Sequence, residues 1–133
     1  NDYQKNRFVQ RIIDFFDGGV NYKNITIVGW SFKKGTKDTR ESPSIHVASS
    51  LLASGAEIIV IDSLVDEERI KLDVNEWLIN YGLSKEEVNK ILTKIKLSRS
   101  FDNSNSDLIS IVHDLDSLEI EKLKSNNIPI IRI

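Results

Sequence analysis

Two short apolar runs with a capped helix between them constrain the fold more than any other feature of this sequence. Residues 25–28 are all β-branched and are followed by Gly29, and residues 57–61 form a second run that is apolar after Glu57. Between these runs Ser42 supplies a capping hydroxyl, and Pro43 suits the first position of a helix. Such runs are typical of strands buried on both faces, as in parallel sheets. The order of strand, helix and strand therefore predicts a βαβ unit with a right-handed crossover.

The same alternation continues toward the C-terminus. Further helices are expected at residues 74–81, 84–95 and 118–124, and further strands at 95–97, 108–112 and 128–133. Ser84 and Glu87 have the spacing of a capping box. The sequence thus predicts an α/β fold with three layers, namely a doubly wound, Rossmann-like and mainly parallel sheet with helices on both faces.

An amphipathic helix is expected before the first strand. Phe8, Ile12 and Phe15 recur at helical spacing, and their stripe needs an apolar partner, which favours a role in oligomer assembly. We assign residues 1–20 to the end of a connecting helix and residues 21–133 to the sheet domain. Because the chain starts without Met inside this helix, we expect it to be a piece of a longer protein.

Composition excludes several classes of function. The 133 residues are 40% hydrophobic and 29% charged, as in an ordinary globular domain, and the formal net charge of -2 offers no basic field for nucleic acid. The absence of cysteine excludes disulfides and thiol nucleophiles from this chain, and two isolated histidines do not suggest a metal site. No apolar run is long enough for a membrane span. We therefore expect a cytoplasmic location with no membrane contact.

The loop after the first strand holds the candidate binding residues. It carries Lys33, Lys34, Lys37 and Arg40 ahead of the helix that starts at Pro43. A helix N-terminus attracts anions through its backbone N–H groups and its dipole, and a guanidinium suits phosphate or carboxylate. Ligands of doubly wound sheets also bind beyond the carboxyl ends of the strands. These features favour an anionic ligand, although solvated loop charges would produce the same pattern.

The order of residues in this loop is similar to a family signature. The matching positions are Phe32, Lys33, Thr36, Asp38, Arg40, Glu41, Ser42 and Pro43. They resemble the start of the C-terminal, UDP-binding domain in the UDP-glucose and GDP-mannose dehydrogenase family. Residues 1–13 resemble the central helix that leads into that domain, and are closest to the branch that oxidises UDP-glucose. The resemblance continues through Gly55, Ala56 and Asp62, and is faint over residues 64–106.

The resemblance implies a function and a set of partners. The family oxidises a sugar-nucleotide alcohol to a carboxylate in two NAD-dependent hydride transfers, through a thioester on a cysteine. It implies that Phe32 and Lys33 bind the UDP-sugar, expected to be UDP-glucose, and that Arg40 approaches NAD across a cleft between domains. The expected partners are the protein's own N-terminal and central domains and further copies in a homo-oligomer. Without cysteine or a Gly-x-Gly-x-x-Gly motif, this chain should hold no catalytic residue and should not catalyse alone.

Other interpretations stay open at this stage. The chain could be a non-catalytic nucleotide-sugar-binding or oligomerisation module related to the family. Phe32 could simply pack within the loop, and Arg40 could pair with Asp38 or Glu41. Trp77 and Tyr81 lie one turn apart and are expected to be core or domain-contact residues.

Overall fold

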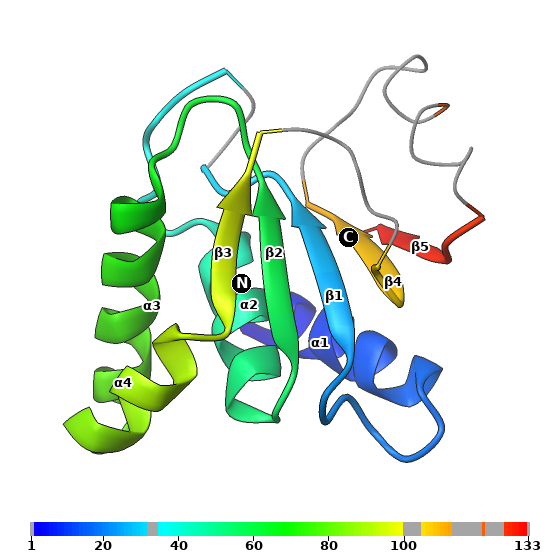
Figure 1. Ribbon diagram of the computed structural model, residues 1–133, viewed down its shortest axis with the longest axis horizontal. Helices are drawn as coiled ribbons and strands as arrows, with labels where there is room; N and C mark the ends of the chain where they lie inside the picture. The colour runs from blue at the N-terminus through cyan, green and yellow to red at the C-terminus, as the bar shows by residue number, and fades with distance from the viewer. Residues whose placement is uncertain (1, 32–34, 100–104, 113–120, 122–126, 133) are drawn as a thin grey trace.

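The computed structural model describes residues 2–31, 35–99, 105–112, 121 and 127–132. Five strands in this part of the chain form one parallel sheet, shown in Figure 1. They are β1 (Asn24–Val28), β2 (Glu57–Ile61), β3 (Ile95–Ser98), β4 (Leu108–Ile111) and β5 (Ile130–Arg132), in the spatial order β3-β2-β1-β4-β5. The chain proceeds outward from β1 to β3 and then crosses to β4. The strand order therefore reverses beside β1, where doubly wound sheets bind their ligands.

Helices connect these parallel strands, as the sequence predicts. α2 (Pro43–Ala53) joins β1 to β2, while α3 (Glu67–Tyr81) and α4 (Lys85–Leu92) lie between β2 and β3. α1 (Asp2–Phe15) packs against α2, and α2 packs against α3. Figure 1 shows α1 and α2 behind the strands, with α3 at the side of β3. No helix in the described residues is long and apolar enough to span a membrane.

The core lies on both faces of the sheet. Ile25 and Ile27 of β1 belong to a large cluster that includes buried residues of α1, α2 and α3. Val28 belongs to a smaller cluster with Ile109 and Ile111 of β4. Because successive strand residues point to opposite faces, this division follows directly from the pleat. It also explains why these strands are mostly apolar, with Thr26 and Ser110 as buried polar exceptions.

Most of the apolar stripe of α1 packs within this chain. Phe8 and Ile12 are buried in the large cluster together with Val9, whereas Phe15 is 42% exposed. The covered part of the stripe does not require a second copy, so only Phe15 still supports the expected role in oligomer assembly. The expected boundary at residue 20 stays a prediction, because these contacts do not define where the domain begins.

The helix expected at residues 74–81 is longer than predicted and begins at Glu67. Ile70, Val74 and Leu78 are fully buried and lie four residues apart, so the buried stripe runs through the whole helix. Charged residues around Ile70 conceal this spacing in the sequence. The capping box of Ser84 and Glu87 is confirmed. The helix expected at 118–124 lies outside the described residues, apart from residue 121.

Gly55 allows the tight turn from α2 to β2. Its φ is +100°, and the N–H groups of Gly55 and Ala56 donate to the carbonyls of Leu52 and Leu51 at 3.0 Å each. This pair of bonds ends a helix with a residue in the left-handed region. The Gly55 carbonyl accepts the N–H of Tyr22 at 2.9 Å, which fastens the turn to the segment before β1.

We expect Gly55→Ala to lower the free energy of unfolding by about 2–3 kcal/mol, from left-handed strain plus crowding. A Cβ at this position would lie 3.2 Å from the Asn21 Cα and 2.2 Å from its Oδ1. The Asn21 side chain is exposed and can rotate away, but its backbone cannot. Urea unfolding measures the loss. Gly18→Ala is the matched control, because φ is +95° there and no atom lies within 4 Å of the new Cβ. Equal losses in the two variants would contradict the crowding.

Candidate functional site

The loop between β1 and α2 starts at the carboxyl edge of the sheet, in a position set by β2. Gly29, with φ +96°, donates its N–H to the Ile61 carbonyl at 2.8 Å and so extends the pairing of β1 with β2. The next N–H, from Trp30, donates to Asp62 Oδ2 at 3.0 Å. The loop is therefore anchored to the end of β2 from its first two residues.

Asp62 organises this edge of the sheet. Besides Trp30, its carboxylate accepts the N–H groups of Leu64 at 2.8 Å and Val65 at 2.9 Å. Its backbone carbonyl accepts a bond from Arg99 Nη1 at 3.0 Å. Asp62 is itself buried. One side chain thus joins the β1–α2 loop to the β2–α3 turn, and its backbone reaches the residue that follows β3.

Two buried serines join the two ends of the loop through hydrogen bonds. Ser42 is the N-cap of α2: its Oγ accepts the N–H of Ser44 at 3.2 Å and donates to the Trp30 carbonyl at 2.6 Å. Ser44 Oγ donates to the Gly29 carbonyl at 2.6 Å. The capping role of Ser42 and the position of Pro43 at the start of the helix, both predicted from the sequence, are confirmed. Ser42 and Ser44 also bind the backbone at the other end of the loop. Residues 29–30 and 42–44 therefore form a fixed base from which the rest of the loop extends.

Glu41 lies in a turn immediately before this cap. Its φ of +57° lies in the left-handed region, which costs a residue with a side chain roughly 1–2 kcal/mol. The fixed base compensates for this strain, since Ser42 is bound both to α2 and to the start of the loop.

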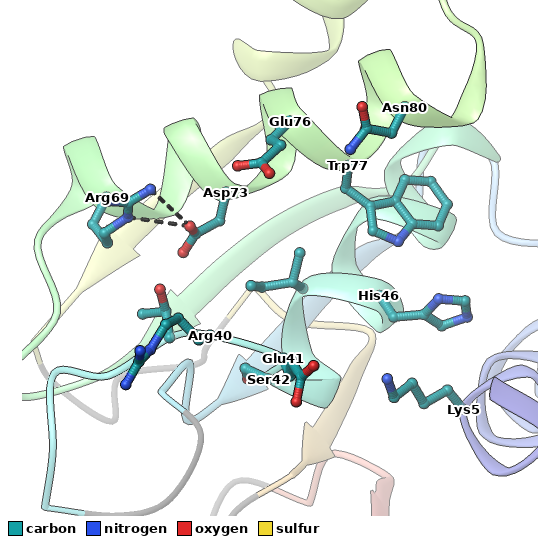
Figure 2. Close-up of a pocket in the computed structure, with 12 residues that line it drawn as sticks. Lys5, Arg40, Glu41, Ser42, His46, Arg69, Asp73, Glu76, Trp77 and Asn80 are labelled. Carbon is teal, nitrogen blue, oxygen red and sulfur yellow. Dashed lines mark hydrogen bonds and ion pairs between the residues drawn. The ribbon is translucent and has the colours of Figure 1, made fainter. Parts of the chain in front are cut away.

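Trp30 links the loop to α3, a contact that sequence reasoning missed. The indole is fully buried, and Nε1 donates to Asp73 Oδ2 at 3.0 Å. The other oxygen of Asp73 accepts Arg69 Nε at 3.1 Å and pairs with Arg69 Nη2 at 3.0 Å. Figure 2 shows this pair on α3, facing the end of the loop. The i, i+4 spacing of Arg69 and Asp73 was visible in the sequence, but nothing there indicated that Trp30 would join them.

Arg40 is held by a neighbouring carboxylate. Its Nε and Nη2 donate to the two oxygens of Asp38 at 3.0 Å each, and its backbone N–H donates to Asp38 Oδ1 at 3.1 Å. These hydrogen bonds lower the pKa of Asp38 to about 2 and raise that of Arg40. The Arg40 side chain remains 87% exposed. The ion pair proposed as an alternative is thus present, while the expected contact of Arg40 with NAD stays a prediction.

A groove of about 450 Å³ lies beside the end of the loop (Figure 2). Residues 39–42 form one wall, Asp73 and Trp77 of α3 form another, and His46 of α2 and Lys5 of α1 complete it. Lysine and arginine alternate with aspartate and glutamate around the groove, so its charge favours neither anions nor cations.

Trp77 and Tyr81 continue the aromatic side of this groove. Their rings stack at 5.0 Å between centroids, and His46 meets Trp77 edge-on at 5.5 Å. Trp77 is half-buried against the core, as expected for a core or contact residue, whereas Tyr81 is 70% exposed. Tyr81 is therefore not a core residue of this chain.

The other loop residues predicted to bind a ligand are Phe32, Lys33, Lys34 and Lys37. Phe32, Lys33 and Lys34 lie outside the described residues, so their predicted roles are neither confirmed nor contradicted. Lys37 is exposed on the loop. Among the described residues no group of three or more histidines, aspartates and glutamates could hold a metal ion.

The turn after β1 does not fit the pyrophosphate of a dinucleotide. Such a turn needs glycines where the cofactor approaches the backbone and an open helix N-terminus. Here Trp30 and Ser31 are buried in the turn, and the N–H of Ser44 is already bound by Ser42. A nicotinamide dinucleotide would therefore need a cradle formed by another part of the protein.

Residues 26–123 match a family model described as the UDP-binding domain of the UDP-glucose/GDP-mannose dehydrogenase family. UDP-glucose 6-dehydrogenase 4 of Arabidopsis thaliana is 48% identical over 75 residues, covering 56% of this chain and 16% of that protein. UDP-glucose 6-dehydrogenase of Bos taurus is 42% identical over 87 residues, covering 65% of this chain and 17% of the relative. The matched part of the chain thus spans about a sixth of the length of these curated relatives.

Solved structures show the same fold. A UDP-glucose dehydrogenase from the archaeon Pyrobaculum islandicum superposes with a TM-score of 0.64 and 20% identity, covering 99% of this chain and 26% of that one. GDP-mannose dehydrogenase from Pseudomonas aeruginosa, solved as a ternary complex, gives the same TM-score and identity, with 99% and 28% coverage. At this identity the similarity establishes the Rossmann-like fold and not the ligand.

We expect Arg40→Ala to raise the pKa of the Asp38 carboxyl from about 2 toward 3.8, because the two side-chain hydrogen bonds to the carboxylate are lost and only the bond from the backbone N–H of residue 40 remains. The folded-state pKa lies below the ordinary value, so the pair stabilises the fold above pH 3.8 and loses this effect as the pH falls toward 2. Carboxyl-detected NMR titration measures the change. Glu87, whose pKa is lowered by its bonds with Ser84, is the internal control and should not respond. An Asp38 that titrates at the same pH in both proteins would contradict the assignment.

Proposed function

Because the chain belongs to the UDP-glucose/GDP-mannose dehydrogenase family through its UDP-binding domain, we propose that it is the UDP-glucose-binding domain of a UDP-glucose 6-dehydrogenase. The whole enzyme would oxidise UDP-glucose to UDP-glucuronate with two NAD in the cytoplasm. This chain has no cysteine, so it would contribute one wall of the substrate cleft and no nucleophile. The cysteine and the dinucleotide cradle would come from the N-terminal and central domains.

The fixed base of the β1–α2 loop, formed by residues 29–30 and 42–44, is the observation that carries this proposal. Ser42 and Ser44 bind the backbone of Gly29 and Trp30, so the chain between them extends from a fixed point at the carboxyl edge of β1. That edge, beside the reversal in strand order, is where sheets of this kind bind ligands. The loop is also the segment that carries the family signature.

Different charged side chains of the loop would bind different ligands. Lys33 would bind the UDP-sugar close to its developing carboxylate, with Phe32 beside it. Arg40 would approach NAD across the cleft, and two features support this role. Its side chain is largely exposed, and Asp38 holds its guanidinium in one orientation through two parallel bonds. A held cation loses less conformational entropy when it binds a partner.

Assembly into a homo-oligomer remains part of the proposal. Most of the α1 stripe does not require it, because Phe8 and Ile12 are covered by this chain, whereas Phe15 is exposed. The exposed Tyr81 beside the half-buried Trp77 provides an aromatic surface for another domain or copy. Aromatic residues of this kind are enriched at protein interfaces.

We expect Lys33→Ala in the full-length protein to weaken UDP-glucose binding by about 10- to 100-fold, the effect of losing one charge-assisted hydrogen bond. Isothermal titration calorimetry with UDP-glucose measures the affinity. Lys37→Ala is the matched control, because Lys37 is an exposed lysine of the same loop with no role implied by the family. An unchanged affinity in Lys33→Ala would remove Lys33 from the sugar-nucleotide site.

We expect Arg40→Ala to raise the KM for NAD by about tenfold, and to change the KM for UDP-glucose less than about twofold. Steady-state kinetics of the full-length enzyme, with each substrate varied in turn, separates the two constants. A rise confined to the KM for UDP-glucose would move Arg40 to the sugar-nucleotide side of the cleft.

A further inference from the structure

β3 is the end strand of the sheet in the part of the chain that the structure describes, so one side of its backbone has no neighbouring strand there. The carbonyls of Lys94 and Ser98 accept N–H groups from the β2 side, at 2.8 and 3.4 Å. The backbone groups of successive residues in a strand point to opposite sides. The N–H groups of Ile95 and Leu97 therefore point outward, along the outer edge of β3.

These two outward N–H groups are covered in different ways. Ile95 is fully buried, so its backbone is inaccessible to another chain. Leu97 is half-buried, and its N–H donates to Glu67 Oε1 at 2.9 Å. Glu67 is the first residue of α3, which Figure 1 shows beside β3. One carboxylate thus occupies the more accessible of the two donors.

The start of α3 is also fastened to the end of β3 by its neighbouring residue. Asp66, the N-cap of α3, pairs with Arg99 at 3.4 Å. Arg99 follows β3 and donates to the backbone carbonyl of Asp62 at 3.0 Å. The backbone that carries Glu67 therefore has a defined place at this end of the edge.

An open strand edge is a template on which a strand of another chain can pair. A second copy is the partner that fits this edge, because two identical edges related by a twofold axis can pair antiparallel with each other. There is space for it, since a hollow of about 530 Å³ lies beside Glu67, lined also by Leu72 of α3 and Leu92 of α4. Leu72 is 49% exposed and would offer apolar surface to such a copy.

We propose that Glu67 keeps the outer edge of β3 closed against pairing with a second copy of the chain. An incoming strand would have to displace the carboxylate from the Leu97 N–H before its own carbonyl could bind there. A hydrogen bond to an ionised acceptor is stronger than one to a neutral carbonyl, so this exchange favours the closed edge. In the proposed homo-oligomer, the copies would then meet through other surfaces.

The test compares the self-association of the full-length protein with that of Glu67→Ala and Glu67→Gln, by sedimentation velocity over a range of concentrations. Glu67→Ala should form assemblies larger than the ordinary one at about tenfold lower concentration, because the competing hydrogen bond is lost. Glu67→Gln loses the same charge but keeps an oxygen acceptor. Its association should begin within about threefold of the concentration found for the unaltered protein.

Glu68→Ala is the matched control, because it removes a carboxylate from the same first turn of α3 and leaves the Leu97 bond intact. It should associate like the unaltered protein. An unchanged distribution of assemblies in Glu67→Ala would overturn the inference. Equal increases in Glu67→Ala and Glu68→Ala would overturn it too, since the effect would then come from the charge at the helix start. Equal increases in Glu67→Ala and Glu67→Gln would show that the acceptor is irrelevant.

Leu97→Pro in the Glu67→Ala background shows whether the new contact uses this edge. Proline has no N–H to donate, and it is tolerated in an edge strand where the N–H points outward. The double variant should associate like the unaltered protein, and its melting temperature reports whether it folds. Association that persists in the folded double variant would overturn the inference. If the double variant does not fold, hydrogen exchange of the Leu97 amide in Glu67→Ala replaces it. That exchange should be at least about tenfold slower in the larger assemblies than in dilute protein, and equal rates would count against the edge.

Discussion

The three hydrogen bonds accepted by the Asp62 carboxylate are the interaction on which the rest of the site depends. Aspartate after a strand can bind the N–H groups two and three residues further on, because its side chain is short. Here it does so with Leu64 and Val65, and it also binds Trp30 from the neighbouring strand end. Replacing it would leave three N–H groups without their acceptor, those of Trp30 and Val65 at buried positions. The β1–α2 loop and α3 therefore share one fixed point.

From that point the loop divides into a rigid base and an exposed, charged outer part. Ser42 and Ser44 hold the base through short hydrogen bonds to backbone carbonyls. Further along the loop, Asp38 orients Arg40 in solvent, where such a pair contributes little to stability. Its effect is instead on the direction of the guanidinium. A rigid base with preset charges suits a binding loop, because less order must be gained when a ligand arrives.

This arrangement shows how the first turn of this chain of the UDP-glucose/GDP-mannose dehydrogenase family differs from a dinucleotide-binding turn. The turn after β1 has the position of a dinucleotide-binding turn, but Trp30 fills it and Ser42 occupies the helix N-terminus. The same fold can thus serve a different ligand when the first turn changes from open glycines to a packed indole. The exposed charged side chains that the structure describes, Lys37 and Arg40, lie further along the loop.

The elements that follow from the sequence alone are those set by residues close together along the chain. The β-branched run before Gly29, the Ser42 cap with Pro43 and the Ser84–Glu87 capping box all appear as predicted. Each depends on contacts within a few residues, so a local pattern is sufficient to identify it. The family signature in the loop is local in the same sense, and it led to the correct family.

Tertiary structure alone decided the strand order, the partner of the α1 stripe and the anchoring of Trp30. Asp62 and Asp73 lie 32 and 43 residues from Trp30 in the sequence, and no periodicity connects positions so far apart. A tryptophan beside a strand predicts burial, but the acceptor of its indole N–H depends on how α3 packs against α2. The packing of whole elements determines such contacts, because each buried polar group takes the partner that the assembled fold brings within reach.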